Sequence, residues 1–135
     1  MRKRTLFAGT LLLLSGCVAE IAYEPGRAYA EPDEAAAEKV EALVLQVMKK
    51  RRSCLSWEDR ELLHKYGGFM LPKVLGWLEG GSGGTKARAA YLLKIMDDPD
   101  TVPYLLRALG DGDRSAAGAA EDALAAISDK ANVFV

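Results

Sequence analysis

Histidine and cysteine are scarce in this chain, and their scarcity narrows the chemistry open to it. The 135 residues include one histidine, His64, and two cysteines. A metal site needs several His, Cys or carboxylate ligands at matched spacing, and a nucleophilic site needs a base with an orienting group. Glu58, Asp59 and Glu61 lie near His64, but acidic residues at the start of a helix are ordinary charge placement. We therefore expect no catalytic residue, no metal, no cofactor and no enzyme activity.

The chain also lacks a surplus of basic charge. Its 18 Lys and Arg residues oppose 19 Asp and Glu residues, which gives a formal net charge of −1. Residues 1–16 hold three bases and no acid, so the rest of the chain has 15 bases against 19 acids, a net charge of −4. Nucleic-acid binding calls for a basic patch. We expect no nucleic-acid partner, and the length fits one domain.

No apolar run in the sequence is long enough to cross a membrane as a helix. TLFAGTLLLL occupies residues 5–14, whereas a transmembrane helix needs about 20 apolar residues. This run follows the basic start MRKR and precedes small residues, an arrangement typical of a secretory signal peptide. Three adjacent bases at the start argue against the alternative, a buried core helix. We predict a signal peptide over residues 1–16.

The stretch LSGC at residues 14–17 resembles the lipobox of bacterial lipoproteins. The resemblance implies cleavage before Cys17, with acyl chains such as palmitate attached to its thiol and its new amine, and several chains give stable membrane anchoring. An exported protein anchored in the cell envelope is therefore expected. Val18 and Ala19 follow the cysteine, with no Asp; in a Gram-negative cell this pattern implies the outer membrane, facing the periplasm.

Residues 17–32 are predicted to be the lipidated Cys and a flexible tether. This stretch contains Pro25, Gly26 and Pro32 and shows no sustained helical period. If Cys17 is lipidated, Cys54 has no partner for an intrachain disulfide. We expect Cys54 to be a half-buried turn residue. A reactive thiol or an intermolecular crosslink is the alternative, because the bases of KKRRS would favour its thiolate.

Helical periodicity dominates beyond Asp33, and no segment alternates with the two-residue period of a strand. Acids open and bases close the first helix, as its dipole prefers, and Ser56 with Asp59 forms a start like a capping box. The expected helices are 33–52, 56–66, 71–80, 85–96, 101–110 and 114–127. The predicted fold class is all-α.

A shift of 31 residues superimposes two halves of this helical region. The shift places Leu71-Pro72 on Val102-Pro103, and the equivalent apolar positions of the following helix also match. The matched pairs are Val74 and Leu105, Leu75 and Leu106, Leu78 and Leu109, Ala89 and Ala120, Leu93 and Leu124, and Met96 and Ile127. Units of this length cannot bury their faces alone and must stack.

The stretch RAAYLLKIMDDPDTVPYLLRAL, residues 88–109, resembles the HEAT-like repeat of bacterial PBS lyase HEAT-like proteins. The resemblance covers about residues 69–130. The helix pair at 34–66 resembles the family only in its arrangement of two successive helices. The resemblance implies a short α-solenoid of about three antiparallel helix pairs over residues 33–135. The second repeat departs from the family pattern, since Ala117 replaces the basic residue that Lys86 supplies in the first. Another array of helical hairpins is the alternative.

The second helix of each pair usually lines the concave face of such a stack. In the helix at 85–96, we expect the apolar stripe to point inward. An Arg and an aromatic residue then point outward, and both residue types are enriched in interfaces. The inward residues are Ala89, Leu92, Leu93 and Met96. The predicted partner-binding residues are Arg88, Tyr91, Ile95 and, in Tyr91's place in the next repeat, Asp122.

These features predict a protein-interaction or adaptor module whose protein partner is unknown, with no small-molecule ligand expected. Two alternatives stay open. One is an accessory subunit or a small lyase-type enzyme, because short HEAT-like repeats also occur in phycobilin lyases. The other is a purely structural envelope lipoprotein.

The glycine-rich stretch GGSGGTK at residues 80–86 lacks the residue order of a phosphate-binding loop. Thr85 precedes Lys86, whereas such a loop has the lysine first and follows a strand. We expect a turn between helices here, with weak anion capture at the amides of Gly84 and Thr85 as the alternative. DDPD and GDGD are expected to be turns with Asp caps.

Overall fold

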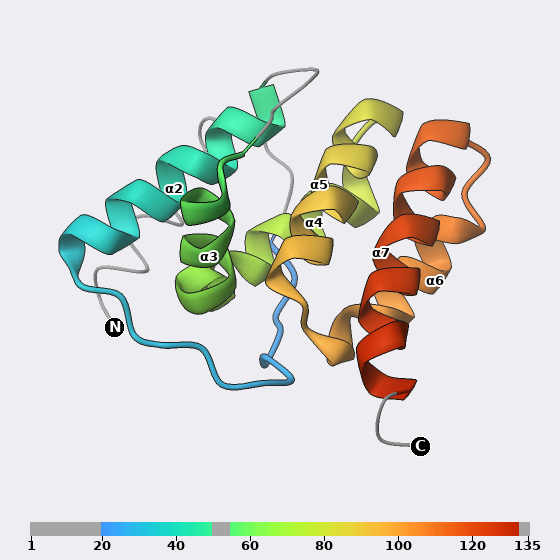
Figure 1. Cartoon of the computed structure of the whole chain (residues 1–135). Coiled ribbons are helices and arrows are strands. Elements are labelled where there is room, and N and C mark those ends of the chain that lie inside the picture. The colour runs from blue at the N-terminus through green and yellow to red at the C-terminus, as the bar shows by residue number, and fades with distance from the viewer. Residues whose placement is uncertain (1–19, 50–54, 133–135) are drawn as a thin grey trace.

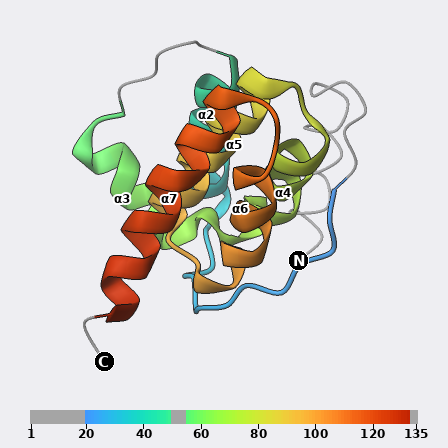
Figure 2. The same cartoon turned by 90° about the vertical axis from the view of Figure 1, so that its right-hand side faces the viewer.

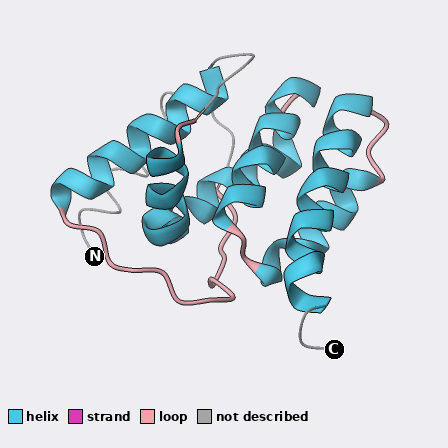
Figure 3. Ribbon diagram, in the orientation of Figure 1, coloured by secondary structure: helices cyan, strands magenta, loops and turns pink. Residues whose placement is uncertain are grey.

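The computed structural model describes residues 20–49 and 55–132, with side chains as far as Ile127, and every regular element in these ranges is a helix (Figures 1 and 3). The predicted all-α class is therefore confirmed. The signal peptide, Cys17 and Cys54 lie outside the described residues. The elements are α2 (Glu34–Lys49), α3 (Trp57–Tyr66), η1 (Gly67–Met70), α4 (Leu71–Gly80), α5 (Gly83–Met96), η2 (Pro99–Thr101), α6 (Val102–Leu109) and α7 (Arg114–Asn132).

Side-chain caps fix the starts of three helices. The Ser56 hydroxyl accepts a hydrogen bond of 3.1 Å from the Asp59 amide at the start of α3, as its sequence predicted. At α2 the Asp33 carboxylate accepts from the Ala36 amide at 2.8 Å. At α7 the carboxylate of Asp113 accepts from the Ala116 amide at 3.0 Å. Each cap satisfies one of the amides that a helix start leaves unpaired.

The 31-residue period of the sequence reappears in the helix boundaries. Helices α4 and α6 begin at Leu71 and Val102, and α5 and α7 begin at Gly83 and Arg114. Both intervals equal 31 residues. A short 3-10 turn precedes both α4 and α6, and a proline lies in the first turn of each, where the missing N–H costs nothing. The predicted turn at GGSGG is shorter than expected, because α5 begins at Gly83 rather than at Thr85.

Consecutive helices pack in pairs, with α2 against α3, α4 against α5, and α6 against α7. Helix α5 is central, since it also contacts α7, α2 and α3. Figure 1 shows α3, α5 and α7 in one row, with α4 and α6 behind α5 and α7. The predicted inward stripe of α5 is confirmed, because all four of its residues are fully buried in the core.

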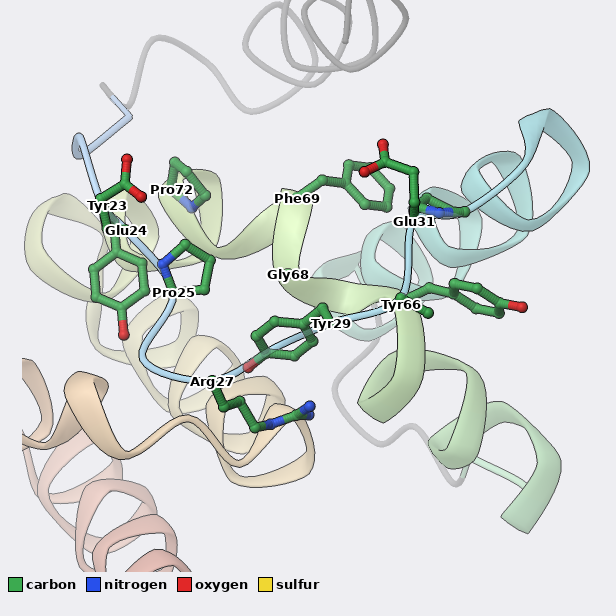
Figure 4. Close-up of a pocket in the computed structure, with 12 residues that line it drawn as sticks. Tyr23, Glu24, Pro25, Arg27, Tyr29, Glu31, Tyr66, Gly68, Phe69 and Pro72 are labelled. Carbon is green, nitrogen blue, oxygen red and sulfur yellow. The ribbon is translucent and has the colours of Figure 1, made fainter.

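Residues 20–33 form an extended segment, which we call the strap, that lies across the helix ends (Figures 1 and 4). The amide of Ile21 donates to the Pro72 carbonyl at 3.0 Å, and the amide of Ala30 donates to the Lys65 carbonyl at 2.9 Å. The sequence predicted a flexible tether over residues 17–32. The described part has no helix, as expected, but it differs from that prediction because the body of the protein holds it in place.

The carboxylate of Asp98, which follows α5, anchors the middle of the strap. This residue is fully buried. It accepts hydrogen bonds from the Tyr23 hydroxyl at 2.8 Å, the Tyr29 hydroxyl at 3.2 Å and the Gly26 amide at 2.9 Å. Burial and the neighbouring carboxylate raise the pKa of both tyrosine hydroxyls far above their ordinary value, so both remain donors. A buried carboxylate is tolerable only with such partners.

Arg27 of the strap caps two helix ends at once. Its guanidinium donates to the carbonyls of Met96 and His64, both at 2.6 Å, and to the Asp97 carbonyl at 3.2 Å. It also lies 3.8 Å from the centre of the Tyr29 ring. A cation at the C-terminus of a helix meets the negative end of the helix dipole. The strap thereby links the ends of α3 and α5.

Candidate partner-binding groove

A groove of about 510 Å³ lies between α3, α5 and α7, on the face formed by the second helix of each pair. Most of its lining comes from α3, with two residues from α5 and one from α7. The lining residues are Trp57, Arg60, Glu61, His64, Lys65, Lys94, Ile95 and Ala126. Because three separate helices form it, the groove exists only in the folded array.

The first residue of α3 places an aromatic side chain at this groove. Trp57 is 71% exposed, more than any other large apolar residue in the described ranges. Ile95 and Ala126 are half-buried within the groove. A large exposed apolar side chain beside half-buried ones is typical of a contact surface, and tryptophan is enriched among residues that dominate binding energy.

The charged lining of the groove is basic, although the chain as a whole is not. Arg60, Lys65 and Lys94 face one acid, Glu61, a local charge of +2 without the histidine. His64 lies with its Nε2 atom 3.8 Å from a carboxylate oxygen of Asp97. Complementary charge guides association and fixes the orientation of a partner. The groove is thus suited to an acidic segment that also carries apolar side chains.

The structure separates the four residues predicted to bind a partner. Ile95 lies in the groove. The Arg88 guanidinium donates to the Met48 carbonyl at 3.0 Å and so caps the end of α2. Tyr91 is half-buried against the core, and Asp122 is exposed on α7 but does not line the groove. The helical period predicted that Arg88 and Tyr91 point outward. In the structure, both side chains are instead largely engaged within the protein.

Sequence reasoning missed the residues that define the groove best. Trp57 carried a usable signal, since it lies outside the apolar stripe of α3 that buries Leu63. Arg60 and Lys94 carried none, because an isolated base on a helix surface is ordinary. Their significance comes from the packing of α3 beside α5, which no spacing within one helix reveals.

A second cavity, of about 360 Å³, lies between the strap and the turn that joins α3 to α4 (Figure 4). Tyr29 and Arg27 reach it from the strap, and Tyr66 and Phe69 from the body. Its strongest polar groups are already engaged, because the Tyr29 hydroxyl bonds Asp98 and the Arg27 guanidinium bonds helix carbonyls. We interpret it as part of the packing between strap and body.

The glycine-rich turn holds its lysine in an internal ion pair. The Lys86 ammonium pairs with the Asp111 carboxylate, and this hydrogen bond lowers the pKa of Asp111.

In residues 20–49 and 55–132, no group of His, Cys, Asp and Glu side chains is arranged to hold a metal ion. Over the same ranges, no helix combines the length and apolarity of a membrane span. The chain matches no protein-family model, no curated protein and no solved structure.

Proposed function

We propose that the chain is an exported lipoprotein, anchored in the cell envelope through Cys17, whose helical domain is an adaptor that binds another protein. The anchor is supported by LSGC, which follows a basic start and a ten-residue apolar run at the positions that a lipoprotein signal requires. A lipid anchor would keep the domain at a membrane surface. Binding would then recruit the partner to that surface.

We infer that the domain is a short HEAT-like solenoid. Two successive helix pairs begin at equivalent positions 31 residues apart, and their second helices, α5 and α7, pack side by side (Figure 1). This regularity supports stacked repeats, in which each unit contacts mainly its neighbours. Stacked repeats offer extended surfaces formed by several helices, and the groove between α3, α5 and α7 is one such surface.

The observation that carries the proposed partner chemistry is Trp57 beside a basic groove. An exposed tryptophan supplies apolar binding energy, and Arg60 and Lys94 supply attraction for acidic residues. The partner segment is therefore acidic and amphipathic, and a helix with apolar residues on one face fits a groove formed between helices. Recognition of this kind weakens as salt screens the charges.

A photo-crosslinking amino acid at Lys94, in the intact cell envelope, tests this proposal. We expect a discrete protein adduct, identified by mass spectrometry, that disappears when Trp57→Ala and Arg60→Glu are added. Thermal unfolding should remain nearly unchanged, because Trp57 and Arg60 are exposed.

Leu106 provides the matched control position, since it is 54% exposed on α6, away from the groove. The crosslinker at Leu106 should not capture the same protein. The same adduct from both positions, or an adduct that persists in the double variant, would contradict the proposed binding site.

A further inference from the structure

The body of the protein fixes the strap from its first described residue onward. The carboxylate of Glu20 lies 3.0 Å from the ammonium of Lys73. Lys73 is only 2% exposed, and its ammonium makes no well-oriented hydrogen bond within the described residues. Loss of Glu20 would thus leave a buried cation without a counter-charge, which is strongly unfavourable. The adjacent Ile21 amide is bonded to the Pro72 carbonyl.

This attachment leaves very little chain between the body and Cys17. Cys17 precedes Glu20 by three residues, and three residues span at most about 10 Å when fully extended. A folded domain of about 100 residues has a radius of gyration of about 13 Å. This stretch from Cys17 to Glu20, which we call the leash, is therefore shorter than the radius of the body that it would hold.

We propose that the lipid on Cys17 acts as a short leash that fixes the orientation of the domain on the membrane, an inference that rests on the proposed lipid anchor. The surface around Glu20, Ile21 and Pro72 then lies against the lipid headgroups. In Figure 2 the beginning of the strap and helix α3 lie at opposite sides of the helix array. The groove beside α3 therefore faces away from the membrane, where a partner can reach it.

Leash length, rather than adsorption, produces this orientation. The strap exposes Glu24 and Glu31, and anionic lipid headgroups repel carboxylates instead of attracting them. A longer leash should consequently release the strap from the surface. Ten added Gly and Ser residues would lengthen the chain from Cys17 to Glu20 to about 13 residues, and a flexible chain of that length has an average end-to-end distance of about 20 Å.

The test uses the mature lipidated protein in vesicles of phosphatidylethanolamine and phosphatidylglycerol that carry a nitroxide quencher on the headgroup. In a Cys54→Ser background, one fluorophore is attached at Glu24→Cys on the strap side or at Lys94→Cys in the groove. We expect quenching at position 24 and little at position 94. A ten-residue Gly and Ser insertion between Ala19 and Glu20 should reduce quenching at 24 to the level at 94, without detaching the protein from vesicles.

Two arms separate failure of the orientation from failure of the anchor. Cys17→Ser should leave the protein unbound and unquenched; membrane binding that survives this change would overturn the lipid anchor itself. Three results with bound protein would overturn the orientation alone. Without the insertion, these are equal quenching at positions 24 and 94 or stronger quenching at 94. The third is an insertion that has no effect on quenching.

Discussion

Glu41 in α2 places a carboxylate oxygen where water does not reach it. This oxygen, Oε2, is buried and has no hydrogen-bond partner among the described residues. Burial, and secondarily the negative charge of Glu38, raise the pKa of Glu41. The folded state thus binds the proton more tightly than the unfolded chain does. Ionised Glu41 destabilises the fold, and this destabilising contribution is relieved as the pH falls through the raised pKa toward the ordinary Glu value.

Glu41→Gln should therefore raise the melting temperature at pH 7. The gain should shrink as the pH falls through the raised pKa toward the ordinary Glu value, because wild-type Glu41 then becomes neutral as well. Thermal unfolding followed by circular dichroism across this acid range measures the effect. Glu121→Gln, at an exposed position on α7, is the control and should change stability little. A Glu41→Gln variant that gains nothing at pH 7 would contradict this account.

For single residues, the sequence predicted the burial of apolar side chains well and the hydrogen-bond partners of polar side chains badly. The helical period alone identifies Leu92 and Leu93 as buried, since neighbours within one helix decide which face points inward. Asp98 was predicted only to cap a turn. It does accept the Asp100 amide at 2.9 Å, but its Tyr23 and Gly26 partners lie 75 and 72 residues away along the chain. No local pattern encodes such partners.

At the scale of elements, α4 and α6 share a sequence pattern but not an environment. Leu75 in α4 is fully buried and Leu78 is 2% exposed. Their equivalents in α6, Leu106 and Leu109, are 54% and 40% exposed. The reason is position in the array, because α6 packs beside α4 and no further described helix covers the other side of α6. The helix starts follow the 31-residue period, whereas burial depends on the next unit.

The same substitution at these two equivalent positions should have very different costs. Leu75→Ala removes a fully buried side chain and should lower the free energy of unfolding by about 2–5 kcal/mol. Leu106→Ala, at a largely exposed site, should change it by less than about 0.5 kcal/mol. Urea unfolding monitored by circular dichroism gives both values. Similar losses at the two positions would show that α6 is covered in solution.

At the scale of the whole molecule, the strap joins parts that the repeat pattern treats as separate. It bonds the end of α3 through Ala30 and the start of α4 through Ile21. Tyr23 also meets Tyr104 of α6 edge to face, with ring centres 5.8 Å apart. Composition predicted a tether here because Pro and Gly suggest flexibility. The prediction failed to include side-chain contacts made at a distance, which only the folded array creates.

Gly26 and Gly84 offer a matched pair of glycines for testing the strap. A Cβ atom at position 26 would lie 2.6 Å from the Asp98 carboxylate oxygen and 2.5 Å from Cγ of Asp100, too close for any real contact. A Cβ atom at position 84, in the first turn of α5, would meet nothing within 4 Å. Gly26→Ala should therefore lower the free energy of unfolding by about 1–3 kcal/mol through forced displacement of the strap. Gly84→Ala should leave stability unchanged or slightly raised, because alanine favours helix more than glycine does.

Hydrogen exchange shows where the stability is lost. In Gly26→Ala, the amides of Ile21 and Ala30 should exchange faster, since both depend on the position of the strap. Amides within α5 should lose protection only to the extent that global stability falls. Unfolding and exchange unchanged from wild type in Gly26→Ala would mean that the strap contributes no cohesion between the helix pairs. Loss at Ile21 and Ala30 alone would instead show that the strap opens as a unit while the helix array stays folded.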